Sequence, residues 1–450
     1  MKKENMLLMV AIAIAAFFSA DVTGSQPFSP AGIGPARASA PSTASYVPGQ
    51  VMVKFRDSIS PVFQKIILRA YGSKIIRTLS GQGRYQMGVP AGYSVEETVS
   101  ALNQNPLVEY AEPNYLVRAS VTPNDPLFNK QYALYNAGGT LLLPGSPIGK
   151  QGADIKATAG WEESKGSAQY LIAILDTGID LLHPDLKGKC FSNGKDFVND
   201  DQDASDDNGH GTVVAGIAGA ETNNSEGIAG VAWNCGLLPV KVLDKDGVGE
   251  MDKVYDGIVW AADMVSNGVK VINISWGLDA SSNLLRDAVE YAYQKGVVIV
   301  AAAGNTGGQV QFPAAYDNFV LAVSATDYLD TRFTLSNTGS EIDVAAPGVD
   351  IITTVPRGYY GPGSVDYGFW TGTSIAAPHV AGLAALIVSI KPFLTVDDIM
   401  NIIRFSADDV NSANYPGKDE FLGYGRINIE KAIVPLIIET VIGTTPTAIR

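Results

Sequence analysis

The sequence predicts an α/β fold whose central parallel sheet carries helices on both faces. Apolar runs that are typical of buried strands occur at 171–175, 237–243, 271–275, 297–302 and 319–325. Helical patterns separate some of these runs, most clearly Glu250–Asn267 and Leu284–Lys295. Strands that alternate with helices form a parallel sheet through right-handed crossovers. We therefore expect one large domain of this kind.

The first 120 residues differ in charge and pattern from the rest of the 450-residue chain. They hold 11 Lys/Arg and 7 Asp/Glu, a net charge of +4, whereas the remaining residues hold 21 and 39, a net charge of −18. Val51–Phe55 alternates as a half-buried strand does, Ser94–Asn103 has helical spacing, and 108–117 has an extended pattern. These features predict a small α+β domain before the large one.

The extreme N-terminus has the composition of a secretory leader. Lys2 and Lys3 precede an apolar run, Met6–Ala20, that is too short for a membrane-spanning helix. We expect a signal peptide over 1–24, a Pro- and Ser-rich linker over 25–45, and a secreted, extracellular protein. The acidic balance of the large domain argues against nucleic acid and anionic membranes as partners.

The stretch 372–382, GTSIAAPHVAG, carries the most chemical information in the chain. Its serine follows a Gly-Thr turn and opens a helix of small residues. At a helix N-terminus the unpaired N–H groups and the positive end of the dipole stabilise a developing oxyanion. Ser374 is therefore a candidate nucleophile, and it needs a base because a free serine hydroxyl is a weak nucleophile.

Only three histidines are available as that base. His379 lies five residues after Ser374 and faces another side of the same helix, so we expect it to be structural. His183 lies in a Leu-His-Pro-Asp turn, and we expect the same of it. His210 opens a second glycine-led helix whose following residues are small, which leaves its imidazole at the rim of the domain. His210 is the predicted base.

The third member of the site is Asp176, which ends the apolar run 171–175 in Asp-Thr-Gly. An aspartate at the carboxyl end of a buried parallel strand lies where open α/β sheets build their sites. Its carboxylate can orient the His210 imidazole and balance its charge. An isolated Asp-Thr-Gly is weak evidence, because many aspartates at strand ends only cap turns. Combined with His-Gly-Thr and with Gly-Thr-Ser-x-Ala-x-Pro, it becomes strong.

The order Asp176, His210, Ser374 and the three surrounding motifs resemble the subtilisin-like serine peptidases, in particular the thermitase-type branch. The resemblance covers 121–434 and implies a subtilisin-like three-layer α/β sandwich with a central parallel sheet. The domain before it, 46–120, is similar to the ferredoxin-like inhibitory pro-domain of such precursors. The tail that follows, 435–450, has no assigned role.

The same resemblance implies the remaining residues of the active site. Asn305 matches the asparagine whose amide holds the oxyanion together with the backbone N–H of Ser374. Two segments would pair with an extended peptide substrate, and a third would wall its first pocket. These three segments are Gly247, Val248 and Gly249; Ser275, Trp276 and Gly277; and Ala302, Ala303 and Gly304.

Two calcium sites are expected. The acidic loop 196–207 concentrates carboxylates that repel one another unless a hard cation neutralises them, although a solvated surface loop is the alternative. The resemblance favours calcium in this loop and implies a second site, in which bound calcium stabilises the fold without a part in the chemistry. The loop ligands are Asp196, Asp201 and Asp203. The ligands of the second site are Asp125, Asp185 and the Asn224 side chain, with the carbonyls of Glu221, Glu226 and Ile228.

Cys190 and Cys235 are the only cysteines in the chain. An even pair in an exported protein suggests a disulfide, and we expect one between them.

The sequence therefore predicts a secreted, calcium-stabilised serine endopeptidase that is made as a precursor and processed near Ser120–Val121. It would act as a monomer on protein or peptide substrates, with its own pro-domain as intramolecular inhibitor and folding aid. One alternative is a processing peptidase of narrow specificity, which Trp276 and the long segment 355–370 would favour. The other is an inactive binding homologue, against which the complete set of site residues argues.

Overall fold

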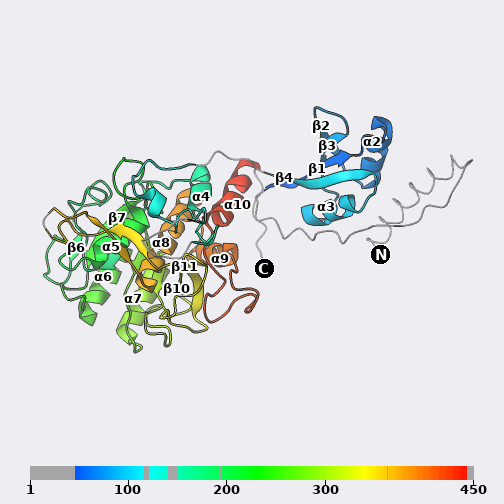
Figure 1. The fold of residues 1–450 in the computed structure, drawn as a ribbon. Coiled ribbons are helices and arrows are strands. Elements are labelled where there is room, and N and C mark those ends of the chain that lie inside the picture. Colours follow the sequence, from blue (N-terminus) through cyan, green and yellow to red (C-terminus); the bar gives the residue numbers. More distant parts are fainter. Residues whose placement is uncertain (1–45, 116–120, 140–148, 193, 362, 443–450) are drawn as a thin grey trace, which may run out of the picture. The chain divides into compact units, whose positions relative to one another are not determined.

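The computed structural model describes residues 46–115, 121–139, 149–192, 194–361 and 363–442, and the chain divides into two compact units (Figure 1). The N-terminal unit ends at Arg118 and the C-terminal unit begins at Ala119. Several predicted features lie outside the described residues: the signal peptide (1–24), the linker (25–45), Ser120 of the processing point, and 443–450 of the tail.

The N-terminal unit is a four-stranded antiparallel sheet with two helices packed into its core. The chain order is β1 (Tyr46–Phe55), α2 (Pro61–Ala70), β2 (Ile75–Thr78), β3 (Arg84–Gly88), α3 (Val95–Asn103) and β4 (Val108–Tyr115). The sheet order is β2-β3-β1-β4, which is the expected ferredoxin-like arrangement. Helix α3 begins at a capping box, in which Ser94 and Glu97 satisfy each other's backbone N–H groups.

The C-terminal unit is built on a seven-stranded sheet in the order β11-β10-β9-β8-β5-β7-β6, with every neighbouring pair parallel. Its strands are β5 (Leu171–Asp176), β6 (Lys195–Asp196), β7 (Gly236–Lys241), β8 (Val269–Ile274), β9 (Val298–Ala302), β10 (Val320–Thr326) and β11 (Ile342–Pro347). Nearly all of these residues are buried, because helices cover both faces of a parallel sheet. The predicted α/β class is confirmed.

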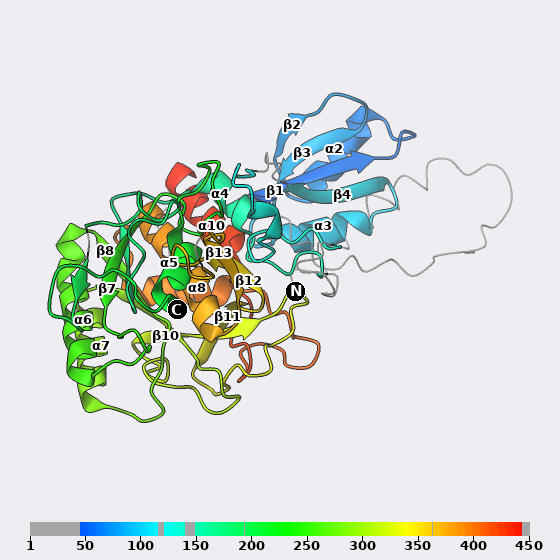
Figure 2. The same ribbon diagram turned by 60° about the vertical axis from the view of Figure 1, so that its left-hand side comes forward.

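Helices cover this sheet in two layers (Figure 2). Helices α6 (Met251–Asp263) and α7 (Asn283–Gln294) share one apolar core with one face of the sheet. Helices α5 (His210–Gly219) and α8 (Thr373–Ile390) share the other core with the opposite face. The helices α4 (Ala157–Glu163), α9 (Val396–Ser406) and α10 (Ile429–Ile442) add to this second layer. The predicted helix over 250–267 ends earlier than expected, and its last turn is the 3₁₀ helix η2 (Met264–Asn267), after which Gly268 has φ 104°.

Helix α8 is the central helix of its layer. It is long and apolar enough to span a membrane by composition alone, with a mean hydropathy of 1.7, but 83% of it is buried inside the unit. His379 lies within it, bonds to the carbonyl of Ile375 and is 2% exposed. Burial lowers the pKa of His379 to about 4, so its imidazole is neutral and structural.

A two-stranded hairpin, which sequence patterns did not predict, precedes α8. Its strands are β12 (Ile351–Thr354) and β13 (Tyr367–Trp370), paired antiparallel with Ile351 opposite Trp370. We call the described residues between the strands, 355–361 and 363–366, the hairpin tip. Each of these strands is four residues long, which is too short to show a clear alternation of polar and apolar residues. These strands were therefore not predicted from the sequence.

The predicted disulfide is wrong, because both cysteines are free. Cys190 pairs by its backbone with Leu237, and burial raises the pKa of its thiol to about 12. Cys235 is buried, and its Sγ lies 3.6 Å from the Ser389 hydroxyl of α8. Cys235 therefore serves as a small buried side chain, whereas Cys190 is half-buried.

Candidate active site

Asp176 is the last residue of β5 and is fully buried. Its Oδ1 accepts hydrogen bonds from the Thr177 N–H and from His210 Nδ1, each at 2.8 Å. Its Oδ2 is also buried and has no hydrogen-bond partner in the described part of the chain. Because only one oxygen of this buried carboxylate is hydrogen-bonded, the carboxylate strongly favours a neighbouring proton donor. Here that donor is the imidazole of His210.

His210 is the first residue of α5 and follows Gly209, whose φ of 118° few other residues adopt. The first turn of α5 packs directly on the turn after Asp176, since a Cβ at Gly211 would overlap the carbonyl oxygen of Gly178. The Gly211 N–H also donates to Thr177 Oγ1 at 2.9 Å. The glycine of the His-Gly-Thr motif therefore brings the imidazole and the carboxylate together.

A second carboxylate, Asp206, holds the loop that leads into His210. Its Oδ1 accepts from the Gly209 N–H at 2.8 Å, and its Oδ2 accepts from the Thr212 N–H and hydroxyl at 2.9 and 2.6 Å. Thr177 Oγ1 donates to the same carboxylate at 2.8 Å. Asp206 thus connects the segments that carry both Asp176 and His210. Asp206 lies in the acidic loop, four residues before His210. This short spacing was the sequence signal that could have indicated its role beside the histidine.

The pKa of His210 is shifted by opposing causes. Burial lowers it, but the charge of Asp176 and the hydrogen bond to it outweigh burial, with a further contribution from Asp206, so the net shift is upward. With Nδ1 donating to Asp176, the neutral ring presents Nε2 as an acceptor. This is the tautomer that a general base requires.

Ser374 is the second residue of α8 and lies in its first turn, where backbone N–H groups have no partner within the helix. Asn305, three residues after β9 ends, has its Oδ1 bonded to the Thr373 N–H at 2.8 Å. A Cβ added at Gly372 would lie 3.2 Å from Ser374 Oγ and 3.3 Å from Asn305 Nδ2. The hydroxyl and the amide donor therefore face the same small space, which only glycine at 372 leaves open.

No hydrogen bond joins Ser374 to His210 among the described residues. Such bonds are often long without substrate and shorten when it binds. Trp370, four positions before Ser374 in the sequence, has its ring centre 6.4 Å from that of His210. The structure thus brings Asp176 and His210 into direct contact, and places Ser374 beside Asn305.

Known proteins are similar to this chain in sequence and in fold. The subtilase family, Peptidase S8, matches residues 167–425, and the fervidolysin N-terminal prodomain matches residues 34–114. The thermophilic serine proteinase of Bacillus sp. (strain AK1) is 41% identical over 390 residues, which cover 86% of this chain and 88% of that protein. The chain belongs to the subtilase family. It is a serine endopeptidase with an N-terminal prodomain.

Two further relatives agree with this assignment. Thermitase of Thermoactinomyces vulgaris is 41% identical over 314 residues, which cover 69% of this chain and 99% of thermitase. A solved protease structure from Pseudoalteromonas arctica PAMC 21717 has a TM-score of 0.61 and 32% identity, and covers 70% of this chain and all of that chain. The subtilisin-like fold is thereby established for the C-terminal unit.

Two of the expected substrate segments of this subtilase, 275–277 and 302–304, lie at the ends of strands β8 and β9. Ser275 to Gly277 follow β8, and the Ser275 hydroxyl donates to the carbonyl of Ser374 at 2.8 Å. The Trp276 indole N–H donates to the carbonyl of Leu175 at 2.8 Å, so its ring is fixed against the strand that carries Asp176. The other segment expected to pair with substrate, 247–249, is exposed and belongs to no strand.

Ala302 ends β9, and the next two residues of the expected pocket wall are buried as well. The Gly304 N–H donates to Thr373 Oγ1 at 3.1 Å, which ties this wall to the start of α8. Added Cβ atoms at Gly277 and Gly304 would each lie 2.6 Å from Gln311 Oε1. Gln311 therefore lies between two expected substrate segments, a contact for which the sequence gave no signal.

Asp125 and Asp185, two expected calcium ligands, are 4% and 0% exposed. Burial raises the pKa of each, and the charge of Asp185 raises that of Asp125 further, because two carboxylates lie near each other. Asn224 Nδ2 donates to Asp185 at 2.8 Å, and the Ile228 N–H donates to it at 2.9 Å. Two buried carboxylates supply the hard oxygen ligands that calcium prefers, and calcium at this site stays a prediction.

The acidic loop gives a different picture. Asp196 is 2% exposed and accepts three hydrogen bonds within its own turn, from the Val198 and Asn199 N–H groups and from Asn199 Nδ2. Asp201 and Asp203 are exposed and accept from their own neighbours. Among the described residues, no group of three or more His, Cys, Asp or Glu is placed to hold a metal. Calcium in this loop stays a prediction.

We expect Asp176→Asn to lower kcat by roughly four orders of magnitude, the scale seen when the triad acid is removed in this family. The acid limb of the pH–rate profile should also move to lower pH, because loss of the Asp176 charge removes what raises the His210 pKa. A neutral base then persists at lower pH. The measurement is residual kcat/KM against pH, with Asp263→Asn on α6 as the matched control. An unmoved acid limb would contradict the assigned pair.

Replacing Asn305 by alanine should lower kcat by about 10²- to 10³-fold with little change in KM, because its N–H groups act on the oxyanion and not on the bound substrate. Since Oδ1 also holds the Thr373 N–H, Asn305→Asp serves as a second variant that keeps this acceptor and loses the donor. Steady-state kinetics on a chromogenic peptide separate the two parameters. A rise in KM at unchanged kcat would rule out the oxyanion role.

Proposed function

We propose that this protein is a secreted, calcium-stabilised serine endopeptidase in which Asp176, His210 and Ser374 form the catalytic triad. The observation that carries the proposal is the 2.8 Å bond from His210 Nδ1 to Asp176, which leaves Nε2 free to take a proton. Ser374 Oγ attacks the substrate carbonyl carbon while Nε2 accepts its proton. Asn305 Nδ2 and the Ser374 N–H hold the oxyanion, and the shared space around Gly372 supports this role.

His210 then returns the proton to the leaving amine, and the carbonyl becomes esterified to Ser374. A water molecule that gives its proton to His210 hydrolyses the ester and restores the serine. Segments 247–249 and 275–277 bind the acyl half of an extended peptide, and 302–304 wall its first pocket. The bonds from Ser275 to the Ser374 carbonyl and from the Gly304 N–H to Thr373 support this assignment for 275–277 and 302–304.

In the precursor, the N-terminal unit acts as inhibitor and folding aid of the peptidase unit, which works as a monomer after release. The match of residues 34–114 to a prodomain supports this role. The leader composition and the extracellular relatives, such as the halolysin-like extracellular serine protease of Natrialba magadii, support secretion.

A precursor experiment tests the proposed function. Wild type and Ser374→Ala are produced side by side with calcium, and their intact masses are measured. Wild type should lose the segment that ends near Ser120, whereas Ser374→Ala should keep it. If the variant matures equally, Ser374 does not perform the cleavage and self-processing is refuted.

Calcium would be held by Asp125, Asp185 and Asn224 with the carbonyls of Glu221, Glu226 and Ile228. Bound there, it neutralises two buried carboxylates and stabilises the folded state.

Chelation should therefore lower the melting temperature of the processed enzyme. Free calcium at a hundred times its dissociation constant would add about 2.7 kcal/mol to the free energy of unfolding. Melting is measured on enzyme inhibited at Ser374, so that autolysis does not interfere. Asp185→Asn should lose the calcium-dependent gain, whereas Asp263→Asn should keep it. Asp196→Asn tests the acidic loop separately. Equal melting with and without calcium in wild type would contradict the site.

A further inference from the structure

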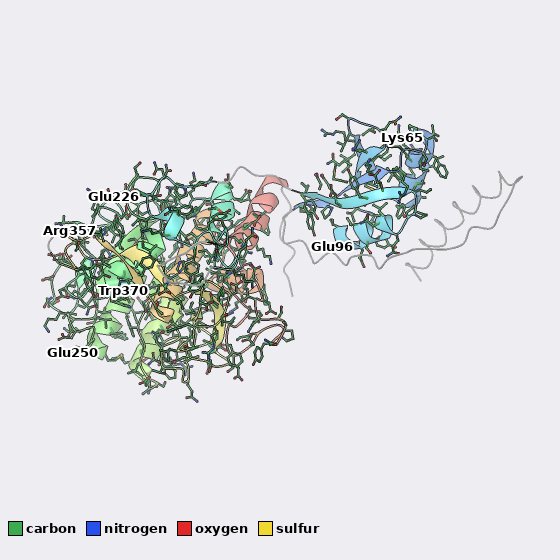
Figure 3. All side chains as sticks on the ribbon, viewed as in Figure 1. Lys65, Glu96, Glu226, Glu250, Arg357 and Trp370 are labelled. Carbon is green, nitrogen blue, oxygen red and sulfur yellow. The ribbon has the colours of Figure 1, made fainter. Side chains whose placement is uncertain are left out.

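A cavity of about 520 Å³ lies between two loops of the C-terminal unit. One loop follows β10 and lines the cavity with residues from Leu329 to Arg332, and the other follows α9 and lines it with residues between 410 and 422. This volume is in the range of small-molecule sites. Figure 3 labels Arg357 of the hairpin tip and Trp370 of β13, and neither of them lines the cavity. No residue assigned above to the active site or to calcium lines it either.

One wall of the cavity is aromatic and apolar. The rings of Tyr415 and Phe421 contact each other with their centres 4.8 Å apart, and Leu422 is buried next to Phe421. Leu329 faces the same cavity from the other loop. Tyr415 is 47% and Leu329 38% exposed, so both keep apolar surface that a ligand can cover. Burial of such surface favours binding of an apolar group.

A positive charge without a carboxylate partner lies beside this wall. The Arg332 guanidinium lies over the Phe421 ring, with its Cζ 5.7 Å from the ring centre. Its Nη1 donates to the carbonyl of Ser336. No Asp or Glu in the described part of the chain forms an ion pair with Arg332. Because a guanidinium has five N–H donors, it keeps donors for a ligand in the cavity.

The carboxylates near the cavity already have partners. Asp330, whose side chain is 6% exposed, forms ion pairs with Lys150 at 3.2 Å and with Arg426. Asp419, on the second loop, accepts three hydrogen bonds from groups of its own loop. The charge at the cavity that lacks a partner is therefore the positive one of Arg332. A group that fills this cavity should be negatively charged at one end and apolar at the other.

We propose that this cavity binds a carboxylate that is joined to an aromatic or large aliphatic group. The carboxylate pairs with Arg332, since a planar guanidinium matches two carboxylate oxygens, and the apolar group packs on Tyr415 and Phe421. Peptide hydrolysis produces such groups, because the acyl half leaves with a new carboxylate and its last side chain fills a pocket walled by the apolar segment 302–304. This source of ligand rests on the proposed function. Free aromatic or fatty acids have the same chemistry.

The test compares three probes that share a fluorinated phenyl ring. One is a tetrapeptide that ends in 4-fluorophenylalanine with a free carboxylate, the second is its C-terminal amide, and the third is 3-(4-fluorophenyl)propionate. The processed enzyme is first treated with a peptidyl chloromethyl ketone, which fills the acyl pockets of the active site. Fluorine NMR titrations give the dissociation constants. The amide should bind about tenfold more weakly than the acid, because it loses a hydrogen bond to a charged group.

Variants assign this binding to the cavity. Arg332→Gln should remove the preference for the acid over the amide. Tyr415→Ala should weaken both peptides, because it removes the exposed ring, and this variant also serves if Arg332→Gln does not fold. Arg286→Gln, at an exposed position of α7, is the matched control and should bind all three probes as wild type does.

Equal affinities for acid and amide in wild type would overturn the proposal, and so would an unchanged preference in Arg332→Gln. If the peptide acid binds more tightly than the propionate, the cavity takes peptide ends. Equal affinities for these two acids would support the same carboxylate site with free apolar acids as its source. Failure of the chloromethyl ketone to inhibit the enzyme would refute the proposed function instead, and the variants would still decide whether the cavity binds the acid.

Discussion

Every strand of the C-terminal sheet points the same way, so the carboxyl ends of β5, β8 and β9 meet at one edge. Parallel strands can deliver side chains from distant parts of the sequence to one place only at such an edge. Here Asp176 ends β5, Ser275 follows β8, and Asn305 follows β9. Helices α5 and α8 begin at the same edge and supply His210 and Ser374. The parallel arrangement of the strands is therefore the first structural requirement for the candidate site.

The hydrogen bond between Asp176 and His210 is stabilised by polar groups that lie behind it. Lys241, 1% exposed, donates to the carbonyl of Thr177 at 2.7 Å and pairs with Asp207 at 2.6 Å. It thereby joins the turn after Asp176 to the loop that precedes His210. A buried lysine is tolerated because its three donors are all used, the last by the carbonyl of Leu243.

Sequence reasoning predicted β5, β7, β8, β9 and β10, because long apolar runs bounded by turn residues leave few alternatives to buried strands, but it missed the edge strands β6 and β11. It also named the triad candidates, since only three histidines had to be separated. It missed contacts between distant segments that no local pattern encodes, such as Gln311 between Gly277 and Gly304. The disulfide failed for a related reason. The number of cysteines does not show whether two of them lie close together. Cys235 packs on α8 instead.

If the sheet edge assembles a working triad, Ser374 should react with a reagent that labels activated serines. Wild type, Ser374→Ala and His210→Ala are treated with a fluorophosphonate, which reacts with an activated serine, and the labelled peptide is identified by mass. We expect a label on Ser374 in wild type, none in Ser374→Ala, and greatly slowed labelling in His210→Ala. Labelling at another serine, or equal rates in wild type and His210→Ala, would contradict it.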